Sequence, residues 1–217
     1  NTMGQEIGNS SERMTGRVAL NARLHEKVRL DVQINATSTE TKTFGQGVNP
    51  LSYATTTSRA LPAYDENGDP VYYQKRCGYP YNRAVENLSY NFINERDNSG
   101  TTNKNIHLST ALNFKWYILD WLSYEFAGGY TASSTNGESY FTERTFRVAQ
   151  NYRGYDYGTV EPGSELFNSA LMPFGGVLFT TDAVQRSYNV QNKLLVSKSF
   201  NEDHRLNAML MMEVRSS

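Results

Sequence analysis

Strict alternation of apolar and polar residues is the strongest pattern in the sequence. Between residues 27 and 37 an apolar side chain stands at every second position: Val28, Leu30, Val32, Ile34 and Ala36. A period of two places these side chains on one face of a β-strand and the polar residues on the other. Similar alternation occurs in six segments, approximately residues 14–24, 28–37, 104–118, 122–132, 187–200 and 204–214. The sequence therefore predicts an all-β fold of antiparallel hairpins.

The alternation also predicts how the strands pair. If Leu24 pairs with Val28, then Leu20 faces Val32, and the apolar residues of both strands share one face. The same argument pairs the aromatic residues of the second hairpin, Trp116 with Tyr124 and Phe114 with Phe126. The third hairpin turns at residues 201–203, and two polar residues, Asn192 and Lys198, fall on its apolar face. Lys198 is close enough to the turn to snorkel, whereas nothing in the sequence explains Asn192.

Strand length and loop length together favour a membrane barrel. The strands are about 10 to 14 residues long, whereas strands of soluble proteins are usually about 5 to 6 and those crossing a bilayer about 9 to 11. Three connections are tight turns, and two are long loops over residues 38–102 and 133–185. Because the strands are antiparallel, both loops lie at one end of the sheet. Long alternating strands with short turns on one side and long loops on the other are typical of outer-membrane β-barrels.

A soluble β-sandwich is the competing interpretation, because its strands also alternate. The aromatic pairs beside the second tight turn favour the barrel, since aromatic girdles lie at membrane interfaces. Charged residues in the middle of the polar face suit a water-filled lumen, although the outer face of a sandwich would carry them equally well. In the barrel the apolar face contacts lipid, and the predicted lipid-facing residues are Val28, Leu30, Val32, Ile34, Phe114, Trp116, Tyr124 and Phe126.

Composition excludes several other classes. The 217 residues include 21 basic and 22 acidic side chains, and the mean hydropathy is −0.61. A net charge of −1 without a basic block argues against nucleic-acid binding. No apolar run is long enough for a membrane helix, and the single cysteine, Cys77, has no partner in the chain for a disulfide. The first residues lack the apolar stretch of a signal peptide, so we expect either a cytoplasmic protein or a piece of a larger one.

The sequence predicts no enzyme, no metal site and no cofactor. The acidic residues 65–69 lack the spacing of a calcium-binding EF-hand, and Asn67-Gly68 is better read as the turn of a small hairpin. No GxSxG, phosphate-binding glycine loop or paired metal ligands are present.

Tyrosine is the best candidate for binding chemistry. The chain has 15 Tyr and 10 Phe. Tyrosines occur in both long loops, and those of the second loop are interleaved with arginine. A tyrosine offers a flat apolar ring and a hydroxyl group at low cost in side-chain entropy, which suits contact with sugar rings or peptides. The alternative is that these side chains only pack the loops together. The predicted substrate-binding residues are Tyr72, Tyr73, Tyr140, Arg147, Tyr152, Tyr155 and Tyr157.

Several stretches, in order, resemble the barrel of SusC-like (SusC/RagA family) TonB-dependent transporters. Residues 49–54 read NPLSYA and residues 57–70 read TSRALPAYDENGDP, followed by YNFINE at 90–95, YNVQNKL at 188–194 and HRLN at 204–207. The resemblance extends from about residue 16 to residue 217 and depends on the order and spacing of these stretches.

The resemblance implies a fold, a function and partners. Members of that family have a 22-stranded barrel with an N-terminal plug. They import glycans or peptides across the outer membrane of Gram-negative bacteria, with a SusD-like lipoprotein lid and with energy from TonB. The chain shows no plug or TonB box, so we expect residues 1–217 to be an internal barrel fragment that cannot transport by itself. The alternative is a soluble β-rich binding or adhesion module that uses its tyrosine-rich loops.

Overall fold

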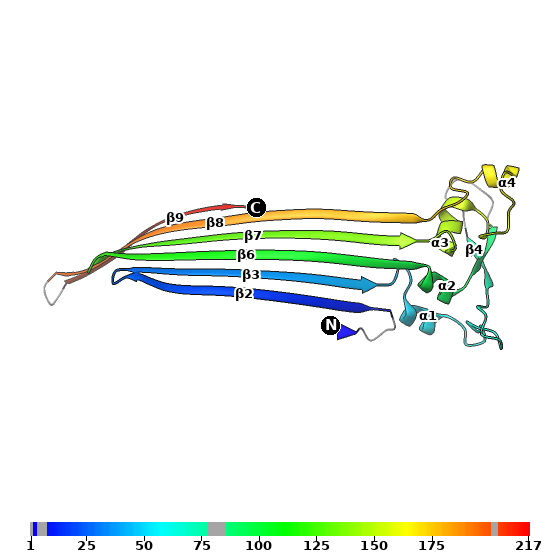
Figure 1. Cartoon of the computed structure of the whole chain (residues 1–217), viewed down its shortest axis with the longest axis horizontal. Helices are drawn as coiled ribbons and strands as arrows, with labels where there is room; N and C mark the ends of the chain where they lie inside the picture. Colours follow the sequence, from blue (N-terminus) through cyan, green and yellow to red (C-terminus); the bar gives the residue numbers. More distant parts are fainter. Residues whose placement is uncertain (1, 4–7, 78–85, 201–203) are drawn as a thin grey trace. The chain divides into compact units, whose positions relative to one another are not determined.

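The main feature of the chain is one long antiparallel sheet (Figure 1). A computed structural model describes residues 2–3, 8–77, 86–200 and 204–217. The sheet has the strand order β1-β2-β3-β6-β7-β8-β9. Its strands are β1 (Thr2–Met3), β2 (Ser10–His25), β3 (Val28–Thr43), β6 (Ser99–Leu119), β7 (Leu122–Phe141), β8 (Val177–Phe200) and β9 (His204–Ser216). The predicted all-β antiparallel fold is confirmed, and the sheet is open, with β1 and β9 at its edges.

The strands extend further into the two long loops than the sequence predicts. β3 continues to Thr43, β7 continues to Phe141 and β8 begins at Val177. The added stretch of β3 has the sequence STETKT, which is polar on both faces and therefore lacks alternation. Backbone hydrogen bonds between strands do not need apolar side chains, and threonine favours strands. The two loops therefore span residues 44–98 and 142–176.

The loops contain short elements of their own. A small separate sheet pairs β4 (Tyr73–Cys77) with β5 (Glu86–Tyr90). The helical segments are α1 (Pro50–Thr56), α2 (Phe92–Asp97), α3 (Phe146–Val148), the π-helix η1 (Ala149–Arg153) and α4 (Glu165–Asn168). The predicted hairpin turn at Asn67-Gly68 is confirmed, because Tyr64 bridges to Pro70 and the Asp65 carboxylate accepts turn amide protons. Among the described residues, no helix has both the length and the apolar character needed to cross a membrane.

The pairing of β8 with β9 confirms the predicted alternation in the third hairpin. Leu194 lies opposite Leu210, and Val196 lies opposite Ala208. The predicted turn at 201–203 lies outside the described residues. In the second hairpin, Lys115 Nζ is 2.5 Å from Glu125 Oε1. Lys115 precedes Asp120 in the sequence by the same number of residues as Glu125 follows it. The predicted pair Phe114 and Phe126 is symmetric about the same residue, so the Lys115–Glu125 contact matches the predicted register.

The two polar residues on the apolar face of the third hairpin have specific partners. The Tyr124 hydroxyl donates a hydrogen bond to Asn192 Oδ1 at 2.5 Å, between β7 and β8. Lys198 Nζ lies 5.0 Å from the ring centre of Trp121 and 5.1 Å from that of Phe200, within the range of cation–π attraction. Asn192 therefore satisfies a tyrosine hydroxyl on the neighbouring strand, which the sequence pattern alone does not reveal.

Replacing Tyr124 by Phe is expected to lower the free energy of unfolding by about 1 kcal/mol, the usual net value of one hydrogen bond. The change removes only the Tyr124 hydroxyl, and with it the hydrogen bond to Asn192 Oδ1. Urea titration of the Tyr124→Phe chain measures the effect, and Tyr130→Phe on the same face of β7 serves as the matched control. Equal stability of both variants would show that the Tyr124–Asn192 contact contributes nothing.

The two faces of the sheet differ in chemistry. We call the side of the even-numbered residues in β2, β3 and β6–β9 the apolar face, and the opposite side the polar face. Cross-strand hydrogen bonds on the polar face join Arg17 to Gln33, Asn35 to Ser109, Asn105 to Thr135, Gln191 to Glu213 and Ser197 to Asn207. Exposed large side chains of the apolar face include Val18, Leu20, Leu24, Ile34, Ile106, Leu112, Trp116, Leu194, Leu206 and Leu210.

Buried residues are confined to one of two compact units of the chain. The sheet unit comprises Arg13–Thr39, Lys104–Asn136 and Asp182–Ser217, and the loop unit comprises Asn1–Glu12, Glu40–Asn103 and Gly137–Thr181. Among the described residues of the sheet unit none is buried, whereas the loop unit contains a core around Leu88, Phe146 and Ala149. A single-layer sheet has nothing to pack against, so its apolar face remains uncovered.

Candidate functional site

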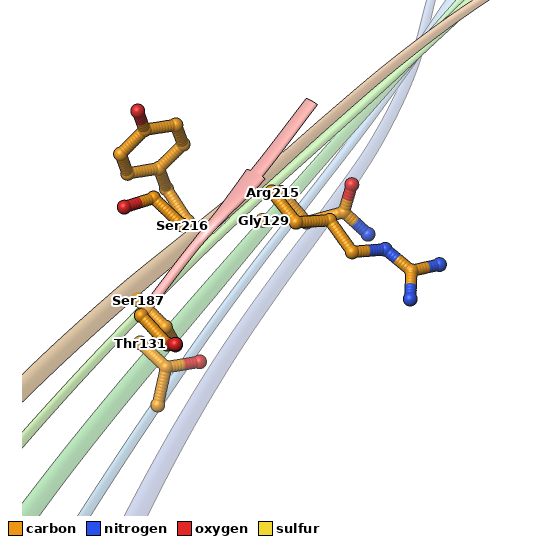
Figure 2. Close-up of a pocket in the computed structure, with 8 residues that line it drawn as sticks. Gly129, Thr131, Ser187, Arg215 and Ser216 are labelled. Carbon is orange, nitrogen blue, oxygen red and sulfur yellow. The ribbon is translucent and has the colours of Figure 1, made fainter. Parts of the chain in front are cut away.

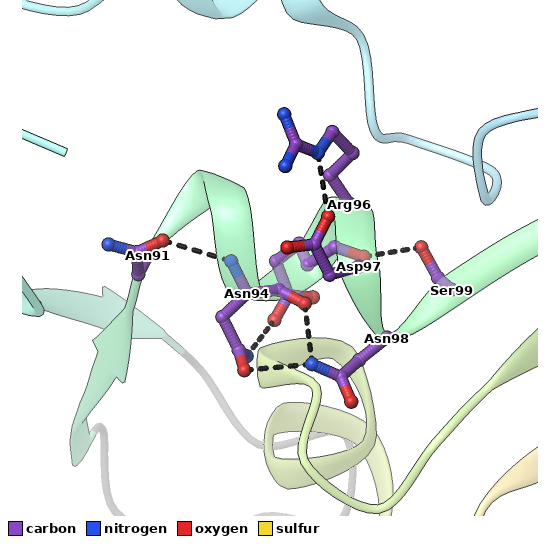
Figure 3. A network of polar contacts seen from close by, with 7 residues as sticks. Asn91, Asn94, Arg96, Asp97, Asn98 and Ser99 are labelled. Carbon is purple, nitrogen blue, oxygen red and sulfur yellow. Dashed lines mark hydrogen bonds and ion pairs between the residues drawn. The ribbon is translucent and has the colours of Figure 1, made fainter. Parts of the chain in front are cut away.

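Polar side chains of α2 join distant segments of the loop unit (Figure 3). The buried Asn91 caps α2, because its Oδ1 accepts from the Asn94 amide at 2.9 Å. Its Nδ2 donates to the carbonyl oxygens of Ala63 and Val71 at 3.0 and 2.8 Å. Asn94 Nδ2 donates to the carbonyl oxygen of Arg144 at 2.9 Å. The helix therefore links the hairpin of the first loop to the second loop.

A buried carboxylate makes a second connection between the loops. Glu95 is only 4% exposed, and its Oε1 accepts from the Phe146 amide at 2.6 Å. Its Oε2 has a longer contact of 3.5 Å with the Arg147 amide. These amides lie at the start of α3, where backbone N–H groups lack helical partners. Burial raises the pKa of Glu95 above its ordinary value, and this effect outweighs the opposite effect of the amide donors.

Aromatic packing surrounds this connection. The rings of Tyr90 and Phe146 meet edge to face with centres 5.3 Å apart, and Lys75 Nζ lies 4.6 and 5.1 Å from these two centres. Burial raises the pKa of Tyr90. The packing holds η1 in place, because Ala149, the first residue of η1, belongs to the same core as Leu88 and Phe146.

The π-helix η1 positions the residues that follow it. It ends at Arg153 and is capped by Gly154, whose φ of 84° lies in the left-handed region that glycine adopts without strain. Single turns of π-helix are rare in proteins overall, but those that occur are often at functional sites. Here the turn buries Arg153 and directs the chain into Tyr155 and Tyr157.

The residues after η1 form one wall of a cavity of about 860 Å³, which we call the aromatic cleft. Phe167 and Phe174 stack with ring centres 6.3 Å apart at an angle of 23°, and Phe174 is 71% exposed. These rings offer flat apolar surfaces to a ligand. The cleft is lined by Glu143, Arg153, Tyr155, residues 157–162, Phe167, Pro173 and Phe174.

Arg153 places a positively charged side chain in the lining of the aromatic cleft. This side chain is 2% exposed, its Nε donates to the carbonyl oxygen of Tyr155 at 3.0 Å, and its guanidinium lies 5.6 Å from the ring centres of both Tyr155 and Tyr157. Desolvation lowers the pKa of Arg153, with partial compensation from nearby acidic groups. Nη2 is buried and has no hydrogen-bond partner among the described residues.

A smaller cavity of about 490 Å³, the polar cleft, shares Tyr157 and Thr159 with the aromatic cleft. Both oxygens of the Asp156 carboxylate accept from the Ser89 amide, at 3.0 and 3.2 Å. The Arg144 guanidinium lies 5.6 Å from the ring centre of Tyr157. The remaining lining residues are Tyr72, Ser89, Asn94, Arg144 and Asp156. Tyr157 therefore stands between two clefts, each of which contains an arginine.

The seven predicted binding residues are not all brought together. Tyr155 and Tyr157 line the aromatic cleft, and Tyr72 and Tyr157 line the polar cleft. Tyr73 packs against the ring of Tyr90, with centres 5.4 Å apart.

The other predicted binding residues lie outside both clefts. Arg147 donates to the Gln46 carbonyl oxygen at 2.8 Å and lies over Phe141, so it joins loop segments. Tyr140 borders a different cavity beside Gly100, and the Tyr152 carbonyl oxygen accepts from the Met172 amide.

Sequence reasoning passes over the three charged residues of the aromatic cleft, Glu143, Arg153 and Glu161. Arg153 and Glu143 are not among the predicted binding residues, although the arginine lies in a tyrosine-rich stretch. Glu143 accepts from the Gly175 amide at 3.0 Å and from the Tyr157 hydroxyl, and these hydrogen bonds lower its pKa. The interleaving of arginine with tyrosine is the one sequence signal that points toward Arg153.

The sheet unit has a cavity of its own, of about 560 Å³, along β7, β8 and β9 (Figure 2). Its lining comes from the sheet surface and includes Gly129, Thr131 and Ser187. Figure 2 shows Arg215 and Ser216 pointing to opposite sides of β9, as alternation requires. Arg215 pairs with Glu213 on its own strand. Because none of its lining residues is buried, this cavity is a weaker candidate than the aromatic cleft.

No protein-family model matches the sequence, and comparison with curated proteins finds no match.

Proposed function

We propose that the chain forms part of the barrel wall and the substrate-side loops of an outer-membrane TonB-dependent nutrient importer. The proposal places the apolar face against lipid and the polar face toward a water-filled lumen. The observation that carries it is the uncovered apolar face, which runs across six strands without a buried residue in the described sheet unit.

Strand length supports this proposal. The six long strands contain from 13 to 24 residues, whereas a tilted strand crosses a bilayer with about 9 to 11. Apolar-out and polar-in alternation over such lengths is the pattern expected of a barrel wall. In water, a contiguous exposed apolar surface of this kind is an aggregation hazard. In a bilayer, lipid chains would cover the apolar surface, so no second protein layer would be needed to bury it.

The resemblance to SusC-like transporters supports the same proposal and supplies its partners. We propose glycans or peptides as cargo, a SusD-like lipoprotein as lid, and TonB as the source of energy. The tyrosine-rich loop unit would then face the substrate, and the proposed role needs neither a catalytic residue nor a cofactor.

Tryptophan fluorescence tests the orientation of the sheet. The chain has two tryptophans, so Trp121→Phe leaves Trp116, which is 44% exposed on the apolar face. In vesicles whose acyl chains carry bromine, a quencher of tryptophan, we expect strong quenching of Trp116. The matched control moves the tryptophan to the polar face by combining Trp116→Phe, Tyr117→Trp and Trp121→Phe, and we expect weak quenching there. Equal quenching, or no association with vesicles, would favour a soluble β-rich binding module instead.

A further inference from the structure

We propose that the aromatic cleft binds a carboxylate-bearing sugar, a uronic acid unit of an oligosaccharide, with Arg153 as the residue that recognises the carboxylate. This inference deepens the proposed function and rests on it for the biological role of the ligand. The binding itself is a property of the loop unit and can be measured independently.

Arg153 has hydrogen-bonding capacity that the described residues do not use. A guanidinium has five N–H donors in a fixed fork that matches a carboxylate. In Arg153 only Nε has a hydrogen-bond acceptor among the described residues, and Nη2 is buried without one. A buried donor without an acceptor is rare and costly in folded proteins. Arg153 lines the aromatic cleft, so a ligand in the cleft is the natural source of the acceptor.

Two carboxylates near Arg153 have other partners. Glu143 accepts from the Gly175 amide and Asp156 from the Ser89 amide. Glu161 also lines the cleft and is exposed, and none of these three carboxylates forms an ion pair with Arg153 among the described residues. The charge of Arg153 is therefore balanced only from a distance, and an anion bound in the cleft would pair with it directly.

The aromatic cleft also offers exposed rings to a ligand. Phe174 and Tyr157 are largely exposed on the cleft, Tyr157 at 47%, and their flat apolar faces suit contact with the apolar face of a sugar ring. A uronic acid carries a ring and a carboxylate in one unit, which matches this pairing of aromatic wall and buried arginine. An acidic peptide would supply the carboxylate but no saturated ring.

Calorimetric titration of the purified chain in detergent micelles tests the proposal. The probes are trigalacturonate and trimannuronate, and the matched ligand control is the methyl ester of each, which keeps the rings and removes the charge. We expect the acids to bind at least about 10-fold more tightly than their esters, since hydrogen bonds to charged groups contribute in this range. Arg153→Met is expected to weaken binding of the acids by about 10- to 100-fold and leave the esters unaffected.

Two variants separate recognition from folding. Arg59→Met makes the same change at an exposed position of the first loop and is expected to leave binding unchanged. Tyr157→Ala changes an exposed side chain and is expected to weaken both acids and esters by about 2- to 10-fold through loss of ring contact. This variant keeps the test decisive if Arg153→Met does not fold.

Three results would overturn the proposal: equal binding of acids and esters, tighter binding of triglutamate than of either uronate, or no binding of any uronate. Failure here is distinct from failure of the proposed function. If the chain binds uronates but Trp116 shows no lipid contact, the uronate proposal stands and the barrel-wall proposal fails. If Trp116 contacts lipid but no uronate binds, the barrel-wall proposal stands and the uronate proposal fails.

Discussion

Leu20→Arg is expected to lower the free energy of unfolding in lipid vesicles by about 2–4 kcal/mol, the cost of a charged side chain near the middle of a lipid-facing strand. Leu20 lies within β2 on the apolar face and is 55% exposed. Exposure is what makes the substitution informative. At a water-exposed position the same change usually alters the free energy of unfolding by no more than about 0.5 kcal/mol. The size of the change at Leu20 therefore shows whether the apolar face contacts water or lipid.

The matched control for Leu20→Arg is Asn21→Arg, one residue further along β2. Asn21 is exposed on the polar face, and the predicted register places it opposite Asp31, so an arginine there is expected to be neutral or mildly stabilising. Urea titration in vesicles compares the two variants, and the amount recovered in the outer membrane gives a second readout. If Leu20→Arg is as stable as Asn21→Arg, the apolar face does not contact lipid.

Glu95→Ala is expected to destabilise the loop unit by about 2–4 kcal/mol. The change removes the acceptor of the Phe146 amide and of the Arg147 amide, and a buried donor left without an acceptor costs about 1–3 kcal/mol. Since the carboxylate joins α2 to α3, both loops are expected to lose protection together. Hydrogen exchange of the amides of residues 146–149 measures this directly. Unchanged exchange would show that water or another group replaces the carboxylate.

The pH dependence of the loop unit separates charge from hydrogen bonding at Glu95. Its pKa is raised in the folded state, so the folded protein binds this proton more tightly than the unfolded chain does. The contribution of Glu95 to stability is therefore largest below its ordinary pKa and falls as pH rises through the raised value. Glu95→Gln is expected to remove this dependence and to destabilise less than Glu95→Ala, because its amide oxygen still accepts from Phe146. A loop unit that becomes more stable as pH rises through that range would contradict the assignment.

Alternation predicts the sheet well because it is a local property. A strand places successive side chains on opposite faces regardless of what lies beyond its neighbours, so the predicted faces of β8 and β9 match their observed pairing. The same logic fails at strand ends. Where both faces are polar, as in residues 38–43, no hydrophobic signal marks a strand, and backbone hydrogen bonding alone extends it.

The loop unit is harder to predict because its decisive contacts are long-range. Asn94 donates to the carbonyl oxygen of Arg144, and Glu95 accepts from Phe146, and in neither pair does local sequence reveal the partner. A tyrosine-rich loop predicts aromatic surfaces, but it does not say which rings face a cleft. Tyr157 lines two clefts, whereas Tyr73 packs onto Tyr90.

The sequence by itself determined the all-β class, the division of each strand into an apolar and a polar side, and the presence of two long aromatic loops. Only the tertiary structure decided that no buried residue lies in the described sheet unit, that Asn192 serves the hydroxyl of Tyr124, and that Arg153 is buried beside an aromatic cleft with a donor unused. The physical reason is that burial and hydrogen-bond satisfaction depend on which distant segments meet, whereas side-chain alternation depends on the backbone of a single strand.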